Sequence, residues 1–188
     1  MPQPIVILTG PPGAGKTTIG RILASGSPRS ACVESDWFWT AIVNGHIPPW
    51  EAAADEQNRV MIRSTLATAA RLSEGGYFTV VDGIIGPWHL DLVRDELASR
   101  GLSATYVVLR PGFDACLARA QGRVGDERSV GHPALTDEGP IRHMWQQFER
   151  LGAYERCVID NTDSGAAETA DVVVGWLSEG RGSLVIGE

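Results

Sequence analysis

A glycine-rich segment close to the start of the chain constrains the fold and the chemistry more than any other part of the sequence. The apolar residues 5–8 before it are typical of a buried strand, and the pattern after it is helical. Four residues separate Gly10 from Gly15, and Lys16 and Thr17 follow directly. This spacing matches the phosphate-binding loop G-x-x-x-x-G-K-[ST].

The chemistry of polyphosphate binding explains the spacing. Glycines allow backbone N–H groups to turn inward around a phosphate, and the next helix presents its positive N-terminal end to the same anion. We expect Lys16 to reach the β and γ oxygens of ATP and the Thr17 hydroxyl to ligate Mg²⁺. The expected ATP-binding residues of the loop are Gly10, Pro12, Gly13, Ala14, Gly15, Lys16, Thr17 and Thr18.

Two other interpretations of the segment are weaker. One is a plain glycine- and proline-rich turn between a strand and a helix. The other is the dinucleotide fingerprint G-x-G-x-x-G, because Glu34 and Asp36 lie near the distance expected for its ribose-binding acid. That fingerprint requires a third glycine where Thr18 stands, whereas a lysine followed by two threonines favours a triphosphate.

Composition limits the class of protein. The 188 residues are 43% hydrophobic, enough for one domain with a sizeable core, and no apolar run approaches the roughly 20 residues of a membrane span. No basic region precedes residues 5–8, so we expect no signal peptide. Three cysteines without metal-like spacing favour a reduced, cytoplasmic protein. A net charge of −7 argues against broad contact with nucleic acid. We expect the protein to be a monomer or a homodimer.

Apolar runs and helical patterns alternate along the chain. The expected strands are residues 5–8, 30–35, 77–81, 104–109 and 156–159. The expected helices after the first are near 36–43, 51–74, 90–97, 113–120, 141–151 and 167–177, with a loose tail from residue 180. This alternation predicts a parallel sheet covered on both faces, with ligands at the carboxyl ends of its strands. The residues expected at those ends are Gly10, Asp36, Asp82, Arg110 and Asp160.

Two aspartates at strand ends are candidates for chemistry. Asp36 follows the second strand, where a carboxylate could accept the proton of a hydroxyl acceptor; it could equally be a helix N-cap. Asp82 ends an apolar strand, as a Walker-B-like carboxylate that holds Mg²⁺ or its water does. The alternative for Asp82 is a turn-forming Asp-Gly pair.

Arginines form a second group of candidates. Residues 122–139 are polar and rich in glycine, and a loop of that length is usually functional or disordered. Arg119, Arg123 and Arg128 lie at its entrance, where arginines of a closing flap could stabilise a transferred phosphoryl group. We favour Arg123 as a catalytic residue and an ATP contact, and Arg119 as an ATP contact, over a solvated basic face. Arg59 and Arg63, four apart on the long helix, could hold a substrate or form a solvated face.

Tryptophans are frequent for a chain of this size, with six in all. Trp37, Trp39, Trp50 and Trp88 lie in the segments that follow the second and third strands. Their rings could line a site for an apolar or ring-shaped acceptor, or they could pack in the core. The candidate acceptor-binding residues are Asp36, Trp37, Trp39, Arg59, Asp82 and Trp88.

These residues together resemble the small P-loop kinases, the superfamily of shikimate, gluconate and nucleoside monophosphate kinases. The resemblance is carried by residues 10–18, by Asp36, by Val80-Val81-Asp82-Gly83, which is similar to the strand-Asp-Gly of adenylate kinases, and by 113–123, which is similar to the helix that leads into an arginine-bearing lid. It is nearest to the chloramphenicol phosphotransferase type, which has a comparable gap to an aspartate serving as general base. The shikimate-type Gly-Gly-Gly after the third strand is missing, which argues against shikimate as the acceptor.

The resemblance implies a three-layer α/β/α P-loop kinase fold with a five-stranded parallel sheet of order 2-3-1-4-5. It implies a single domain over 1–188, a lid over ATP at about 122–139, and an adenine-side loop near 161–163 that brings Asn161 to ATP. It also implies Lys16, Asp36 and Arg123 as catalytic residues, with Mg²⁺ held by Thr17 and by Asp82, directly or through water.

Three functions are compatible with these features. The first is an ATP- and Mg²⁺-dependent kinase that phosphorylates a hydroxyl of a small molecule, such as an antibiotic or a sugar-like metabolite. The second is a nucleoside, nucleotide or polynucleotide 5′-hydroxyl kinase, whose polynucleotide version the acidic balance disfavours. The third is a nucleotide-binding ATPase module. The guanine-specifying Asn-Lys-x-Asp is absent from the sequence, which argues against a GTPase switch.

Overall fold

The computed structural model describes residues 1–122 and 135–184. Its central sheet contains the five predicted parallel strands in the predicted order β2-β3-β1-β4-β5. The strands are β1 (Ile5–Thr9), β2 (Ser30–Glu34), β3 (Phe78–Asp82), β4 (Ala104–Leu109) and β5 (Val158–Ile159). The carboxyl ends of the strands therefore lie along one edge of the sheet, where the phosphate-binding loop follows β1.

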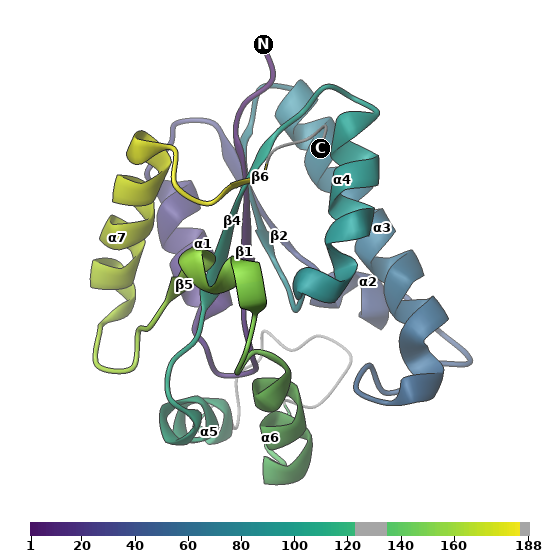
Figure 1. Cartoon of the computed structure of the whole chain (residues 1–188). Helices are drawn as coiled ribbons and strands as arrows, with labels where there is room; N and C mark the ends of the chain where they lie inside the picture. Colours follow the sequence, from purple (N-terminus) through teal and green to yellow (C-terminus); the bar gives the residue numbers. More distant parts are fainter. Residues whose placement is uncertain (123–134, 185–188) are drawn as a thin grey trace.

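Helices cover both faces of the sheet, as the alternating pattern predicted. They are α1 (Lys16–Ser25), α2 (Asp36–Thr40), α3 (Asp55–Glu74), α4 (Leu90–Ala98), α5 (Phe113–Gln121), α6 (Glu138–Gln147) and α7 (Ala166–Glu179). Figure 1 shows α1 and α7 on one side of the sheet and α3 and α4 on the other, with α5 and α6 beyond the carboxyl ends of the strands.

The pleat of β1 explains the two hydrophobic cores. Successive side chains of a strand point to opposite faces, and β1 is buried on both. Ile5 and Ile7 belong to the cluster on the α3 and α4 side, whereas Val6 and Leu8 belong to the cluster under α1 and α7. A strand covered twice needs an unbroken apolar sequence, which residues 5–8 supply.

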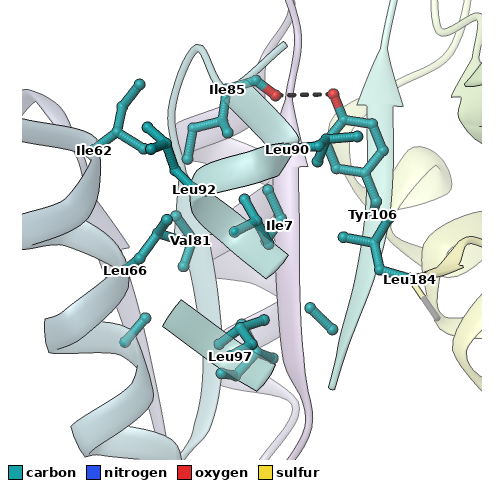
Figure 2. Packing of buried hydrophobic residues seen from close by; sticks show 14 of the residues in the cluster. Ile7, Ile62, Leu66, Val81, Ile85, Leu90, Leu92, Leu97, Tyr106 and Leu184 are labelled. Atoms are coloured by element: carbon teal, nitrogen blue, oxygen red, sulfur yellow. Dashed lines mark hydrogen bonds between the residues drawn. The ribbon is translucent and has the colours of Figure 1, made fainter. Parts of the chain in front are cut away.

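One buried hydrogen bond in the larger core fixes the segment after β3. Figure 2 shows Tyr106 of β4 donating its hydroxyl hydrogen to the carbonyl oxygen of Ile85, over 2.8 Å, among Leu90, Leu92 and Ile62. Burial raises the pKa of Tyr106 far above its usual value, so the hydroxyl stays protonated and donates. The bond holds the chain just beyond Asp82, at the carboxyl edge of the sheet.

Four element boundaries differ from the sequence predictions by more than two residues. The helix predicted at 36–43 ends at Thr40, and the helix predicted from residue 51 begins at Asp55, after a 3₁₀ turn at Ala52–Ala54. The helix predicted at 141–151 covers Glu138–Gln147, which includes the last two residues of the predicted lid. The predicted fifth strand keeps only Val158–Ile159, because the residues before it belong to a 3₁₀ helix, Gly152–Cys157.

A sixth strand corrects the prediction of five strands and a loose tail from residue 180. β6 (Ser183–Leu184) pairs with β4 in the antiparallel direction, with Leu184 opposite Ala104. Leu184 is buried in the larger core, so apolar burial holds the tail to the sheet. Two residues show no periodicity that a sequence pattern could reveal.

Candidate active site

The phosphate-binding loop packs so closely on its neighbours that two of its glycines leave no room for a side chain. Gly10 and Gly13 have φ angles of 146° and 79°, in the region that favours glycine. A Cβ atom on Gly10 would lie 2.1 Å from the carbonyl oxygen of Leu109, and one on Gly13 would lie 2.0 Å from that of Cys116. The loop is therefore wedged between the end of β4 and α5.

Lys16 is the first residue of α1 and is 9% exposed. Its ammonium group donates a hydrogen bond of 3.1 Å to the carbonyl oxygen of Pro11, across the loop. Burying an ammonium group costs solvation energy, so a buried lysine in a loop of this sequence indicates a site for an anion. Lys16 is also the only lysine in the 188 residues, so a reaction specific for lysine side chains can take place only in this loop.

Asp82 ends β3 beside this loop and is 5% exposed. Burial raises the pKa of Asp82 to about 6, against the charge of Lys16 and a hydrogen bond with the Thr17 side chain, which both lower it. Thr17 donates this bond, because a carboxylate can only accept. A cation, a hydroxyl group and a carboxylate are thus gathered at the start of α1.

Asp36 lies at the same edge, as the first residue of α2, and is exposed. Its negative charge contributes to the raised pKa of Asp82, so the two carboxylates belong to one site. The backbone fixes this placement: the N–H of Ser35 donates to the carbonyl oxygen of Asp82 over 2.7 Å. The alternative role of Asp36 as an N-cap is not seen, because Ser35 occupies the cap position and no side chain caps the helix.

The loop after β5 closes the other side of the phosphate-binding loop. Asn161 is 2% exposed and donates a hydrogen bond of 3.0 Å from Nδ2 to the carbonyl oxygen of Ala14. Arg119 of α5 donates from Nη2 to the carbonyl oxygens of Asn161 and Thr162, over 3.0 and 2.9 Å. Of these two predicted ATP contacts, Asn161 thus contacts the phosphate-binding loop, whereas Arg119 contacts the loop after β5.

Two further strand-end residues have structural partners. Arg110 donates to Glu155 over 2.9 Å and to the carbonyl oxygen of Phe148 over 3.0 Å. Asp160 accepts hydrogen bonds from the hydroxyl and the N–H of Thr162, which lower its pKa. Both therefore stabilise the end of the sheet. Arg123 and Arg128 lie outside the described residues, as does most of the predicted lid, residues 123–134.

The other predicted acceptor residues come from three segments: Trp37 and Trp39 from α2, Trp88 from the 3₁₀ turn after β3, and Arg59 from α3. Trp37 and Trp88 are 53% and 42% exposed, which is high for such large rings. Trp39 instead packs partly against the core, and its Nε1 donates to Oδ1 of Asn58 over 3.2 Å. Arg59 pairs with Asp91 over 2.7 Å, which ties the start of α3 to the start of α4.

Some residues that shape the site escape sequence reasoning. Asn58 and Asp91 position Trp39 and Arg59, but neither belongs to a motif, and only the tertiary structure brings the pairs together. Ser35 packs closely against Gly83. A Cβ atom on Gly83 would lie 2.5 Å from the Oγ atom of Ser35. The close packing against Ser35 therefore requires a glycine at position 83, directly after β3, a reason that the sequence alone does not show.

The residues present fit a magnesium ion better than a metal held by protein alone. Among residues 1–122 and 135–184, no group of three or more His, Cys, Asp or Glu side chains is placed to hold a metal. Mg²⁺ is usually bound by one or two carboxylates together with substrate phosphates and water, and the Asp82 carboxylate with the Thr17 hydroxyl supplies donors of that kind.

Among residues 1–122 and 135–184, none of the helices has the length and apolar character to cross a membrane.

Comparisons of sequence find no match, either among models of protein families or among curated proteins. Comparison of structure does. The tunicamycin resistance protein of Deinococcus radiodurans matches with a TM-score of 0.63 and 21% identity, over 93% of this chain and 95% of that one. Shikimate kinase from Acinetobacter baumannii, in complex with shikimate, matches with a TM-score of 0.60 and 22% identity, over 95% and 94%.

A third solved structure also matches this chain. APS kinase of Mycobacterium tuberculosis, in complex with AMPPNP and APS, matches with a TM-score of 0.64 and 17% identity, over 94% of this chain and 98% of that one. Identities this low show a common fold rather than a common activity. With its strand order and its phosphate-binding loop, the chain has the fold of the small P-loop kinases.

Proposed function

We propose that this protein is a cytoplasmic, ATP- and Mg²⁺-dependent phosphotransferase that phosphorylates a hydroxyl group of a small molecule, such as an antibiotic or a sugar-like metabolite. One observation carries the proposal: the buried Lys16, the Thr17 hydroxyl and the buried Asp82 carboxylate meet at the start of α1. The P-loop kinase fold supports it, because in this fold the same loop holds the phosphates of a nucleotide.

In this proposal the loop binds the polyphosphate through its backbone N–H groups and the positive end of α1. Lys16 exchanges its bond with Pro11 for the β and γ oxygens of ATP. Asp82 and Thr17 would hold Mg²⁺, which would neutralise charge on the transferred phosphate when bound. Arg119 and Asn161 belong to the nucleotide side, where the loop after β5 borders the phosphate-binding loop.

In the proposed transfer, Asp36 acts as the general base. The acceptor's oxygen attacks the γ-phosphorus, the bond to the β-phosphate oxygen breaks, and ADP leaves. The acceptor's proton passes to the Asp36 carboxylate, which is exposed beside the site and next to Trp37. Trp37 and Trp88 offer exposed ring faces to the acceptor, and Trp39 and Arg59 hold the surrounding helices.

The remaining assignments rest on the sequence. We assign Arg123 to the negative charge that develops on the transferred phosphoryl group, and residues 122–139 to a lid within a single domain. An acceptor with an apolar or aromatic ring suits the two exposed tryptophans.

The decisive experiment joins binding to turnover. Calorimetry with Mg²⁺ and a non-hydrolysable ATP analogue should give a saturable heat, and a thermal-shift screen of nucleosides, sugars and antibiotics with the analogue present should identify the acceptor. Transfer of labelled γ-phosphate to that acceptor would then establish the activity. A protein that binds no ATP, or that hydrolyses ATP without transfer to any hydroxyl compound, would contradict the proposal.

A further inference from the structure

The peptide bond between Ala14 and Gly15 has a partner that the loop sequence does not supply. The carbonyl oxygen of Ala14 accepts the 3.0 Å hydrogen bond from Nδ2 of Asn161, a residue 147 positions later in the chain. Ala14 is fully buried and Asn161 nearly so, at 2% exposure. The bond is therefore shielded from water, and no solvent molecule can readily replace either partner.

The geometry of a peptide explains why this bond matters. In a trans peptide the C=O and the next N–H point in opposite directions. A carbonyl oxygen of Ala14 turned toward Asn161 therefore aims the N–H of Gly15 away from Asn161. The N–H of Gly15 thus lies on the side of the peptide opposite Asn161, as an inward-turned donor of a phosphate-binding loop requires.

The flexibility of Gly15 explains why the loop needs a hydrogen bond that fixes the orientation of this peptide. Its φ angle is 91°, and a Cβ atom on it would meet nothing closer than Ile19 Cδ1 at 3.4 Å and Asn161 Nδ2 at 3.9 Å. A glycine with this freedom allows the preceding peptide to rotate, so the loop sequence alone does not select one orientation. The hydrogen bond from Asn161 does select one.

Asn161 is itself held from the far side. Arg119 donates to the carbonyl oxygens of Asn161 and Thr162, and Thr162 Oγ1 accepts from the N–H of Gly112 over 2.8 Å. The Oδ1 atom of Asn161 is buried and has no hydrogen-bond partner among residues 1–122 and 135–184. A buried acceptor without a partner destabilises a fold, so its retention points to a function rather than to stability.

We propose that Asn161 is a positioning residue that sets the Ala14–Gly15 peptide so that the Gly15 N–H faces the bound phosphate. In this role Asn161 acts through the peptide. A direct contact of Asn161 with ATP, as the sequence predicts, is a separate prediction. The inference rests on the proposed function, because it concerns the same nucleotide site.

The test is the variant Asn161→Asp, which keeps the shape but replaces the donor by an acceptor facing Ala14. The dissociation constant of a non-hydrolysable ATP analogue with Mg²⁺ should rise about tenfold or more, as expected for a lost buried donor. At saturating ATP, kcat should stay within about threefold of wild type, because Asp36 and Lys16 are untouched. Asn161→Ser, whose hydroxyl is too short to reach Ala14, should weaken binding in the same direction and serves if Asn161→Asp does not fold.

Thr162→Val is the matched control. It removes the hydroxyl bonds to Gly112 and to Asp160 from the same loop and leaves the Asn161–Ala14 bond in place. Its melting temperature should fall while its affinity for the analogue stays near wild type. An unchanged affinity in both Asn161 variants, or an equal loss in Thr162→Val, would overturn the inference. A wild-type protein that binds no analogue would contradict the proposed function instead.

Discussion

Thr17 and Asp82 are joined by a hydrogen bond that links the first turn of α1 to the end of β3. The partner carboxylate is buried, and its pKa of about 6 lies within the range in which proteins are usually assayed. The proposed magnesium binding and the stability of the fold should therefore both depend on pH, with opposite signs.

The first prediction concerns Mg²⁺ and protons. Because Asp82 must be ionised to ligate a cation, affinity for Mg²⁺ with the ATP analogue should fall as pH drops below about 6. At pH 6, where Asp82 is about half protonated, binding should release up to about half a proton from it. Calorimetry in buffers of different ionisation enthalpy measures that number. Proton release that is unchanged in Asp82→Asn would show that another group titrates.

The second prediction concerns stability in the absence of nucleotide. A carboxyl group with a raised native pKa stabilises the fold while protonated, and this contribution is lost as pH rises through about 6. Asp82→Asn should therefore be more stable than wild type at pH 7, by about 2 to 3 kcal/mol, and about equally stable below pH 4. Urea unfolding of both proteins at several pH values measures the difference. A less stable variant at pH 7 would refute the assigned cost of burial.

The third prediction uses the single lysine. Lys16→Ala should lose a charge-assisted phosphate contact of roughly 1.5–3 kcal/mol, visible by calorimetry as a weaker affinity for ATP. An acyl-phosphate derivative of ATP, which acylates a lysine beside the phosphates, should label one side chain in the whole chain, and ATP should protect it. Arg21→Ala, which removes an exposed cation of the same helix, is the control. Labelling that ATP does not reduce would contradict the assignment.

The fourth prediction concerns Asp36→Asn. The variant should bind ATP as wild type does, and its stability should change little, because Asp36 is exposed and caps no helix. Its kcat should fall by about 10²–10⁴, as expected for a lost general base. Single-turnover transfer to the acceptor found by the screen measures this step. A wild-type rate would remove Asp36 from the chemistry and leave Asp82 as the better candidate.

The fifth prediction contrasts two glycines. Gly13→Ala places a methyl group against the carbonyl oxygen of Cys116 at a positive φ angle, so the loop must shift, and both ATP binding and about 2 kcal/mol or more of stability should be lost. Gly175→Ala, inside α7, meets nothing within 4 Å and should stabilise the fold by about 0.5–1 kcal/mol. Thermal unfolding of both variants, with binding assays, separates a local need for glycine from a general effect.

The sequence predicted the parts of this fold that depend on local patterns. The doubly buried β1, the loop after it and the Asp-Gly after β3 could be located because each has a period or a fixed spacing. The strand order came from the resemblance, and the structure confirms it. β6 could not be predicted, because its two residues are held by pairing with β4 and by burial of Leu184.

Side-chain partners were harder to predict than positions. Arg119 was expected at a phosphate on the strength of its place in a helix, yet its guanidinium group is bonded to the carbonyl oxygens of Asn161 and Thr162. Arg59 was a candidate for substrate binding, and its partner Asp91 lies 32 residues away. Such pairs form only when the sheet brings distant helices together, so no local window contains the information. Whether either arginine also contacts a ligand remains a prediction.

The short β6 also has a protective role. β4 lies between β1 and two short strands that share its outer edge: β5 pairs with Val108 and Leu109, and β6 pairs with Ala104 and Thr105. Removing residues from 183 onward would uncover the N–H and C=O groups of the amino-terminal half of that edge, beside strongly apolar residues. An open edge of this kind can pair with the same edge of another copy. By covering this part of the edge, β6 therefore opposes edge-to-edge aggregation.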